Sequence, residues 1–390
     1  MRARVSPLLG LLVGVVAPAL FGWSGCSAKP SGASNALDAA APDTGAPLVT
    51  PAPAGAGGCE LGLPLAPEGC IGADAGAETV TSDGKPVVFG FAAADPATGD
   101  WQASGGGAVA QVFYSSADNA WEANLLSAFD QANPTPIATL RGTPTSCTSM
   151  TFSGGGWSGT LDGTTLSLGD GTQTLALQRT PRPSPTLCAP PPAGAVLLFD
   201  GTNFDQWGTI AGKDWLHTSG PPMWTLVDGG AGGAMEVQPN TASIITQPTF
   251  GACTIHVEFR TLGTPTHSGV FPEARYQITI LQTYGLLSGN LTGDLGNENP
   301  VVNPTVHAER PPLMWQTLDI DFTPSGGGDG GAGGPSATVR LNGVTLFEDY
   351  ALSPPSGAAA SLPPAPTGPI LLEYHGMPLQ YRNIWVVPSP

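Results

Sequence analysis

Apolar and polar residues alternate along several segments of this chain, most regularly at 255–260, 275–281 and 317–322, and the segments at 370–375 and 381–386 also have a strand pattern. Successive side chains of a β-strand point to opposite faces of the sheet, so the alternation predicts strands with one dry and one wet face. In the first segment Ile255, Val257 and Phe259 form the dry set, and His256 and Glu258 lie on the wet face. This half of the chain is therefore predicted to fold as sheets.

Turn-forming residues separate these segments and favour an all-β fold. The chain has 54 Gly and 41 Pro among 390 residues, and only 11% of its residues are charged. Long surface helices need Glu, Lys and Arg on their wet face, so this composition argues against them. It fits short strands joined by turns, and the length favours two folded domains.

Residues 1–26 have the pattern of a secretory signal. Arg2 and Arg4 form a positive start, residues 8–21 are largely apolar, and Ser24 and Gly25 precede Cys26. The apolar stretch is too short to span a membrane. Its ending resembles the lipobox of bacterial lipoproteins, in which Cys26 would be lipidated, and ordinary secretory cleavage is the alternative. We expect an exported protein, lipid-anchored at the outer membrane and facing the periplasm or the cell surface.

Four further segments follow this signal. Residues 27–58 are almost entirely Ala, Pro, Gly, Ser and Thr, which predicts a disordered linker. Residues 59–180 carry short β-type runs, with a hairpin expected at 157–171, and predict a small β-rich domain. Residues 181–193 form a Pro-rich connector. Residues 194–390 hold the alternating strands and all five histidines, so acid–base chemistry is expected there.

The cysteines fit an oxidising compartment. With Cys26 set aside, we expect disulfides Cys59–Cys70 and Cys147–Cys188. Cys253 is left over and is expected to be a small buried side chain. The cysteine and histidine spacings suggest no zinc site, and we predict no metal.

The net charge of −17 bears on the partners. A chain this acidic is repelled by phosphate backbones, so we expect no nucleic-acid partner. The lipid at Cys26 would be the only membrane contact.

Six motifs of the C-terminal domain together resemble the 3-keto-disaccharide hydrolase family, long a domain of unknown function. They are LFDGTNFDQW (198–207), IHVEFR (255–260), HSGVFPEARYQITILQTYG (267–285), RPPLMWQTLDIDF (310–322), LNGV (341–344) and GPILLEYHGMPLQYRNIWVV (368–387). The resemblance covers 194–390. It implies a concanavalin- or laminin-G-like jelly-roll sandwich, preceded here by the small β-rich domain.

The resemblance also implies a chemistry. The family breaks down glycosides already oxidised to a ketone at C3. That carbonyl acidifies the C2 proton, so a base can remove it, the C1 substituent leaves, and water then adds. The expected partner is an oxidised glycoside or an oligosaccharide, with no cofactor on this chain.

The family's polar motif positions imply the site residues. His256, Glu258 and His375 are the candidate catalytic residues, with either histidine as base and Glu258 as its orienting or acidic partner. The substrate-binding candidates are Arg260, Arg275, Gln277, Asp319, Glu373 and Arg382. All of them are expected on the wet surface of one curved sheet. His217, His267 and His307 are expected to be structural.

Some positions depart from the family pattern. Gln277 and Gln282 replace carboxylates, and Thr279 replaces a glutamine. Glu373 and Tyr374 stand where Gln-Asp is common. An amide binds sugar hydroxyls but transfers no proton at neutral pH. The alternative to an enzyme is therefore a carbohydrate-binding module of the same fold.

Overall fold

A computed structural model describes residues 97–115, 118, 120–146, 148–229, 233–262, 266–289, 291–295, 301–326, 333–355 and 359–389. The signal at 1–26, the linker at 27–58, and Cys26, Cys59, Cys70 and Cys147 lie outside the described residues, so the lipid anchor and both disulfides stay predictions. Within the described part, no helix has the length and apolar character needed to cross a membrane.

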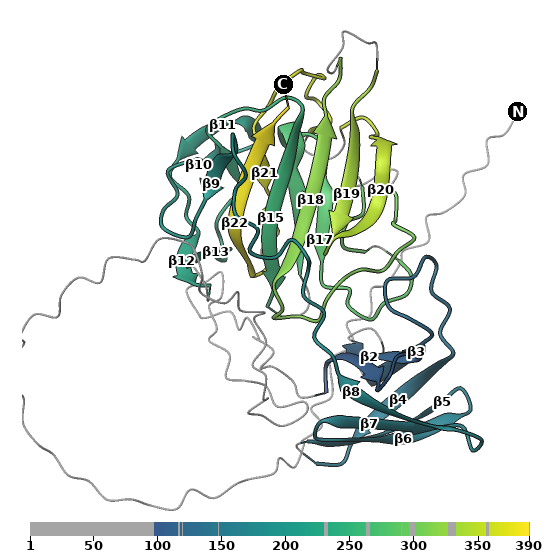
Figure 1. The fold of residues 1–390 in the computed structure, drawn as a ribbon. Coiled ribbons are helices and arrows are strands. Elements are labelled where there is room, and N and C mark those ends of the chain that lie inside the picture. The colour runs from purple at the N-terminus through teal and green to yellow at the C-terminus, as the bar shows by residue number, and fades with distance from the viewer. Residues whose placement is uncertain are drawn as a thin grey trace, which may run out of the picture. The chain divides into compact units, whose positions relative to one another are not determined.

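The first described domain is a closed barrel of eight antiparallel strands in chain order (Figure 1). These are β1 Gly99–Ala103, β2 Val109–Ser115, β3 Ala120–Leu126, β4 Ala138–Pro144, β5 Ser149–Gly154, β6 Trp157–Asp162, β7 Thr165–Gly169 and β8 Thr174–Arg179. Strand β1 pairs with β8 and closes the barrel. Its interior is filled by apolar side chains, among them Trp101, Leu140 and Leu161, each 0% exposed. The barrel is a packed core, as small barrels are.

The hairpin expected at 157–171 is confirmed. Strands β6 and β7 pair from Ser158↔Gly169 to Asp162↔Thr165. The turn between them contains Gly163 at φ 56°, a conformation that glycine adopts without steric cost.

The second domain is a sandwich of two antiparallel sheets. The six-stranded sheet has the order β11-β10-β14-β21-β16-β17. The eight-stranded sheet has the order β12-β13-β22-β15-β18-β19-β20, with β9 also paired to β22. The strands are β9 Val196–Phe199, β10 Trp207–Ala211, β11 Asp214–Gly220, β12 Thr225–Asp228, β13 Gly233–Glu236, β14 Ile244–Thr246, β15 Cys253–Thr261, β16 His267–Phe271, β17 Ile278–Leu281, β18 Gln316–Thr323, β19 Ser336–Leu341, β20 Val344–Ala351, β21 Leu371–Leu372 and β22 Leu379–Pro388.

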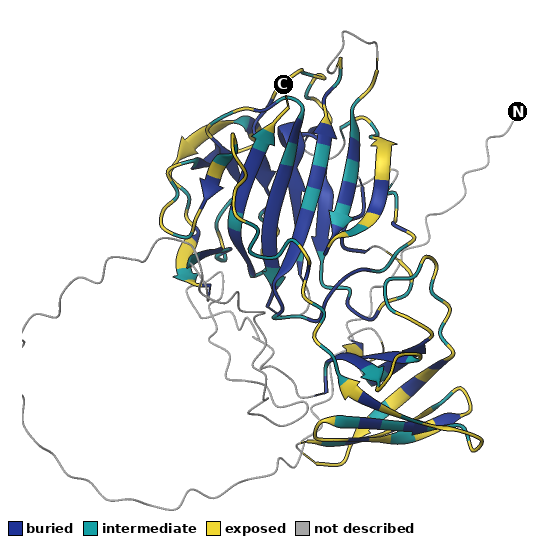
Figure 2. Ribbon diagram, in the orientation of Figure 1, coloured by how far each residue is buried: buried dark blue, intermediate teal, exposed yellow. Residues whose placement is uncertain are grey.

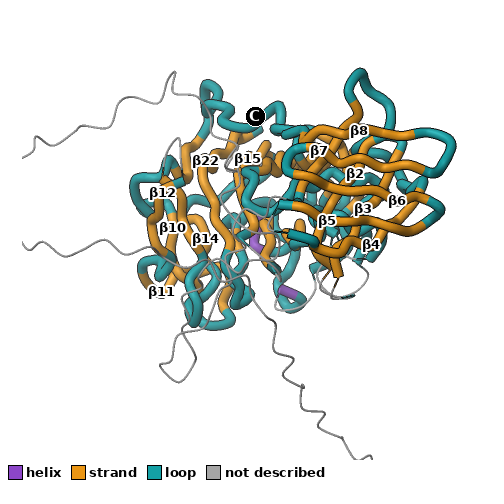
Figure 3. Tube along the Cα trace, turned by 90° about the horizontal axis from the view of Figure 1, so that it is seen from below, coloured by secondary structure: helices purple, strands orange, loops and turns teal. Residues whose placement is uncertain are grey.

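The main core lies between these sheets. The predicted dry set of β15, Ile255, Val257 and Phe259, is 0% exposed and packs with Ile278 and Leu372 of the other sheet. Figure 2 shows β15 and β18 buried along most of their length, while the edge strand β20 is largely exposed. Strands and loops make up nearly all of the described chain (Figure 3), and the fold is all-β with a jelly-roll-like sandwich.

The expectation that all five alternating segments share one sheet is wrong. Strands β15, β18 and β22 lie in the eight-stranded sheet, whereas β17 and β21 lie in the six-stranded sheet. Strands β17 and β21 are also shorter than predicted, because a 3₁₀ turn at Pro272–Ala274 precedes β17 and the chain leaves the ladder after Leu372. Alternation fixes which side chains share a face of one strand, but it does not fix which strands become neighbours.

The segment between the barrel and the sandwich contacts both domains. Arg182 donates from Nε to Asp100 of β1 at 2.9 Å and from Nη1 to Asp130 at 2.8 Å. Arg310 of the sandwich also donates to Asp130, at 3.0 Å, and the Tyr284 hydroxyl donates to Asp100 at 2.8 Å. A polar cluster therefore joins the barrel, the connector and the sandwich.

Candidate functional site

The outer face of the six-stranded sheet carries a set of polar side chains that are only partly hydrogen-bonded. Val270 and Ile278 point into the main core, so their neighbours Gly269, Gln277 and Thr279 belong to the opposite face. The backbone N–H of Glu373 donates to the carbonyl of Gly269 at 3.0 Å, which places Glu373 beside Gly269. This outer face is the candidate functional site.

Glu373 is the central ionisable group of this face. It is 5% exposed, and desolvation by burial raises its pKa to about 7. Its Oε2 accepts a hydrogen bond from Gln277 Nε2 at 3.1 Å. Gln277 Oε1 is buried and has no hydrogen-bond partner among the described residues. A carboxyl with a pKa near 7 exchanges a proton at neutral pH, and the free amide oxygen can accept a ligand hydroxyl.

Two histidines lie next to Glu373. The rings of His267 and His375 stack with centroids 3.9 Å apart, and His267 Nε2 lies 4.0 Å from Glu373 Oε2. Burial, followed by the charge of His375, lowers the pKa of His267 to about 4, so this ring is neutral at pH 7. His375 is exposed at the rim. The pair therefore offers the neutral ring of His267 and the accessible ring of His375.

Gly269 makes room for the Gln277–Glu373 contact. A Cβ on Gly269 would lie 3.0 Å from Gln277 Nε2 and 2.9 Å from a ring carbon of Phe271. The Gln277 amide thus crosses the strand where no side chain stands. Any larger residue at this position would push the amide away from Glu373.

Arg275 was predicted on this face as a substrate ligand, but its contacts are structural. Its Nε donates to the Pro363 carbonyl at 2.8 Å, and Nη1 donates to the Glu273 carbonyl at 2.8 Å. The side chain is buried, with the residue 5% exposed. It holds a loop against the 3₁₀ turn.

The remaining predicted site residues lie on the outer face of the other sheet. His256 and Glu258 are both 0% exposed. His256 Nδ1 is 2.6 Å from Asp319 Oδ1, and its ring stacks on Trp385 with centroids 4.6 Å apart. Arg382 Nε donates to Glu258 Oε2 at 2.7 Å. We call these residues, His256, Glu258, Asp319 and Arg382, the buried charge network.

The connector covers this network. The backbone N–H of Cys188 donates to Glu258 Oε1, and Thr186 Oγ1 donates to Asp319 Oδ2 at 2.7 Å. Burial alone would lower the pKa of His256, but Asp319 and Glu258 outweigh it and raise that pKa. Burial alone would raise the pKa of Glu258, but His256 and Arg382 outweigh it and lower that pKa. The network is thus a balanced set of opposite charges.

The expectation that these residues meet His375 on one open surface is wrong. His256, Glu258 and Arg382 belong to β15 and β22 of one sheet, while Gln277, Glu373 and His375 lie with the other sheet. Arg260 lies on the same sheet as the buried charge network. Its Nε donates to Gln380 Oε1 at 2.6 Å, and its guanidinium lies over the ring of Trp315. Because the connector covers His256 and Glu258, these side chains offer no surface to a sugar in this structure.

His267 is the site residue that sequence reasoning missed. It was expected to be structural because a single histidine on a strand usually is. The sequence indicates that His267 shares a strand face with Gly269, which lies two residues later. Only the pairing of β16 with β21 shows that His267 lies next to Glu373.

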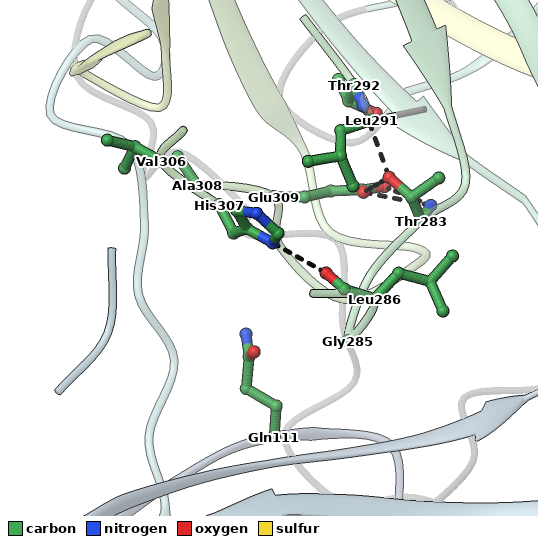
Figure 4. Close-up of a pocket in the computed structure, with 10 residues that line it drawn as sticks. All are labelled: Gln111, Thr283, Gly285, Leu286, Leu291, Thr292, Val306, His307, Ala308 and Glu309. Atoms are coloured by element: carbon green, nitrogen blue, oxygen red, sulfur yellow. Dashed lines mark hydrogen bonds between the residues drawn. The ribbon is translucent and has the colours of Figure 1, made fainter. Parts of the chain in front are cut away.

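A hollow is lined by Gln111 of β2 and by residues that follow β17, and Figure 4 shows its lining. Burial raises the pKa of Glu309 there to about 8, and both of its carboxyl oxygens accept hydrogen bonds from Thr283. His307 Nδ1 is 2.8 Å from the Leu286 carbonyl. These polar groups are already used within the protein. Among the described residues, no three His, Cys, Asp or Glu side chains are grouped as a metal site requires.

Comparison with known proteins gives the family. The profile of the 3-keto-alpha-glucoside-1,2-lyase-like domain matches residues 194–387. No curated protein matches the chain.

The solved structures that the chain is similar to include two proposed glycosyl hydrolases from Parabacteroides distasonis. One is 26% identical, covering 51% of this chain and 85% of its own, with a TM-score of 0.40. Another is 17% identical, and the match covers 50% of this chain and 94% of the other, with a TM-score of 0.35. A carbohydrate-binding module of Bacillus subtilis is 8% identical, covering 46% and 93%, with a TM-score of 0.29.

The profile match spans all six motifs of the sequence and the whole sandwich, and it indicates a carbohydrate-active protein. The chain therefore belongs, through residues 194–387, to the 3-keto-alpha-glucoside-1,2-lyase-like family.

Proposed function

We propose that this protein is an exported, lipid-anchored enzyme that cleaves 3-keto-glycosides on the outer face of its six-stranded sheet. The observation that carries the proposal is Glu373, whose pKa burial raises to about 7 beside a Gln277 amide with a free oxygen. A base for C2–H abstraction needs a pKa near the working pH. The family supplies the substrate class.

The reaction balances with one base and one acid. The Glu373 carboxylate takes the C2 proton, and the C2–H electrons form an enolate with the C3 carbonyl. The enolate collapses, the C1=C2 double bond forms, and the C1–O bond breaks. The departing oxygen takes a proton from an acid. Water then adds to C1, C2 is reprotonated, and the free 3-keto sugar is released.

The neighbours of Glu373 fit this role. The Gln277 amide donates to the carboxylate and fixes its direction, while Gln277 Oε1 can accept a sugar hydroxyl. The neutral His267 adds no charge that would hold Glu373 permanently ionised. His375 at the rim is a further donor to a bound sugar. In this proposal Glu373 moves from substrate binding to base, and His375 from base to ligand.

A non-catalytic carbohydrate-binding module is the second candidate. The amide of Gln277 favours it, because an amide binds hydroxyls without transferring protons. The two candidates differ in one outcome, which is turnover.

The test uses the full chain and a 3-keto-disaccharide such as 3-keto-trehalose. We expect release of free sugar through a 2-hydroxyglucal intermediate, and a loss of about 100-fold or more in kcat/KM for Glu373→Gln. His217→Gln, a change at an exposed histidine, is the control. Binding seen by calorimetry without turnover would establish the module. If the chain shows no binding and no turnover, both functions are refuted.

A further inference from the structure

The proposed reaction needs an acid for the departing oxygen, and the described residues offer one that sequence reasoning did not select. We propose that Asp294 is the second proton-transfer group of the candidate site, facing the sugar from the other side of Gly269 and Thr279. The inference rests on the proposed function, and it adds a residue to it.

The ladder places Asp294 on the outer face. Leu295 bridges Ile278 and packs in the main core, so Asp294 belongs to the opposite side by strand alternation. The Thr279 N–H donates to the Asp294 carbonyl at 3.0 Å, and the Gly293 N–H donates to the Thr279 carbonyl at 2.7 Å. Asp294 is thus fixed beside Thr279 at the edge of the sheet.

The residues that lie side by side across the neighbouring strands, beginning with Asp294 and Thr279, continue to Glu373. Thr279 pairs with Gly269, and Glu373 is hydrogen-bonded to the Gly269 carbonyl. The order across the sheet is therefore Asp294, Thr279, Gly269 and Glu373. Adjacent strands lie about 4.8 Å apart, so the two acidic residues are roughly 14 Å apart at Cα. The residues between them are a glycine and a threonine, and the Gln277 amide lies over the glycine.

Asp294 has an unused oxygen. Its Oδ2 accepts from the Leu291 N–H at 2.8 Å, but Oδ1 is buried and has no hydrogen-bond partner among the described residues. The residue is only 1% exposed. An unpaired buried carboxyl oxygen costs free energy that a protonated carboxyl or a bound ligand reduces. Burial, partly offset by the Leu291 N–H, raises the Asp294 pKa to about 7.

The two acids divide the chemistry. Glu373 begins as a carboxylate and takes the C2 proton, while Asp294 begins protonated and gives its proton to the oxygen leaving C1. In the hydration step Asp294 takes a proton from the attacking water, and Glu373 returns its proton to C2. Both groups end as they began. Asp294 also supplies a carboxyl to a face where the sequence has an amide at Gln277.

The experiment compares Asp294→Asn with Glu309→Gln in the full chain. Both changes remove a buried carboxyl of raised pKa, but the Glu309 oxygens are already bonded to Thr283. For Asp294→Asn we expect kcat/KM on 3-keto-trehalose to fall about 100-fold, with loss of the alkaline limb of a bell-shaped pH profile. Glu309→Gln should keep both limbs.

A wild-type chain without turnover overturns the proposed function and the role of Asp294 with it. A wild type with turnover, together with an Asp294→Asn variant within about twofold of it and with both limbs kept, overturns the role of Asp294 alone. If Asp294→Asn does not fold, Asp294→Glu replaces it, and carboxyl ¹³C NMR of the wild type gives the second readout. There the Asp294 signal should titrate near pH 7 and move when the keto sugar is added, and a signal that the sugar leaves unmoved overturns the inference.

Discussion

At the scale of single residues, two clusters of similar composition differ in the charged partners of their ionisable groups. His256 and Glu258 have charged partners on both sides and are sealed by the connector. Glu373 has an amide donor and a neutral histidine 4.0 Å away. The first arrangement stabilises fixed charges, and the second leaves a proton free to exchange. We therefore propose that the first is structural and that the second is the site for chemistry.

Removing one charge of the buried network should destabilise the fold. Arg382→Met leaves the Glu258 carboxylate buried without its guanidinium, and we expect the free energy of unfolding to fall by about 3–5 kcal/mol. Urea unfolding measures this loss. The matched control is Arg340→Met, whose pair with Asp321 is solvent-exposed and should contribute less than about 1 kcal/mol. Equal losses in the two variants would show that the network does not stabilise the domain.

His256 should make stability depend on pH. Its folded pKa is raised above the unfolded value of 6.5, so its contribution is fully present below pH 6.5 and is lost as pH rises through the folded pKa. The His256→Gln variant should therefore lose this alkaline decline. Melting temperatures from pH 5 to 9 measure it, with the exposed His217→Gln as control. A decline of the same size in His256→Gln would count against this linkage.

At the scale of elements, the short strands β16, β17 and β21 build the site because they bring small residues next to ionisable ones. Gly269 of β16 lies between Thr279 and Glu373 and leaves space for the Gln277 amide. The strands are short because the chain turns before β17 and after β21, and Gln277 and Glu373 are the residues directly outside these two strands. The polar side chains thus lie at the strand ends.

A methyl group at Gly269 should disturb the site more than the fold. In Gly269→Ala the new Cβ would stand 3.0 Å from Gln277 Nε2 and 2.9 Å from a ring carbon of Phe271, so the amide must shift and its hydrogen bond to Glu373 is weakened. Losing a hydrogen bond to a charged group costs about 1.5–3 kcal/mol, and we expect kcat/KM to fall about 10- to 100-fold. Steady-state kinetics and a melting curve measure both effects. Gly220→Ala on β11, where a Cβ meets nothing within 4 Å, should leave both unchanged.

At the scale of the whole molecule, one polar cluster couples the barrel, the connector and the sandwich. Asp100 of the barrel accepts from Arg182, Gln111 and Tyr284, and is 3% exposed. Tyr284 follows β17 in the sandwich, so the carboxylate is shared by both domains. Cooperative unfolding of the two domains depends on such shared contacts.

Replacing Asp100 should uncouple the domains. Asp100→Ala leaves Arg182 buried with one carboxylate fewer, and we expect unfolding free energy to fall by about 3–5 kcal/mol. In calorimetry a single transition should split into two. Asp162→Ala is the control, because Asp162 is exposed on β6 and bonds only Ser149 among the described side chains. A single, unshifted transition in Asp100→Ala would contradict the coupling.

The sequence by itself determined the all-β class, the dry faces of β15, β18 and β22, the hairpin of β6 and β7, and the family of residues 194–387. These follow from local rules, since side-chain alternation, turn residues and motifs act within a few residues of one another. Only the tertiary structure decided which polar residues meet. It separated His256 and Glu258 from His375 by assigning them to different sheets, and it joined His267 and Asp294 to the face of Glu373. The physical reason is that strand pairing depends on contacts between segments far apart in the chain, and alternation carries no information about the partner strand.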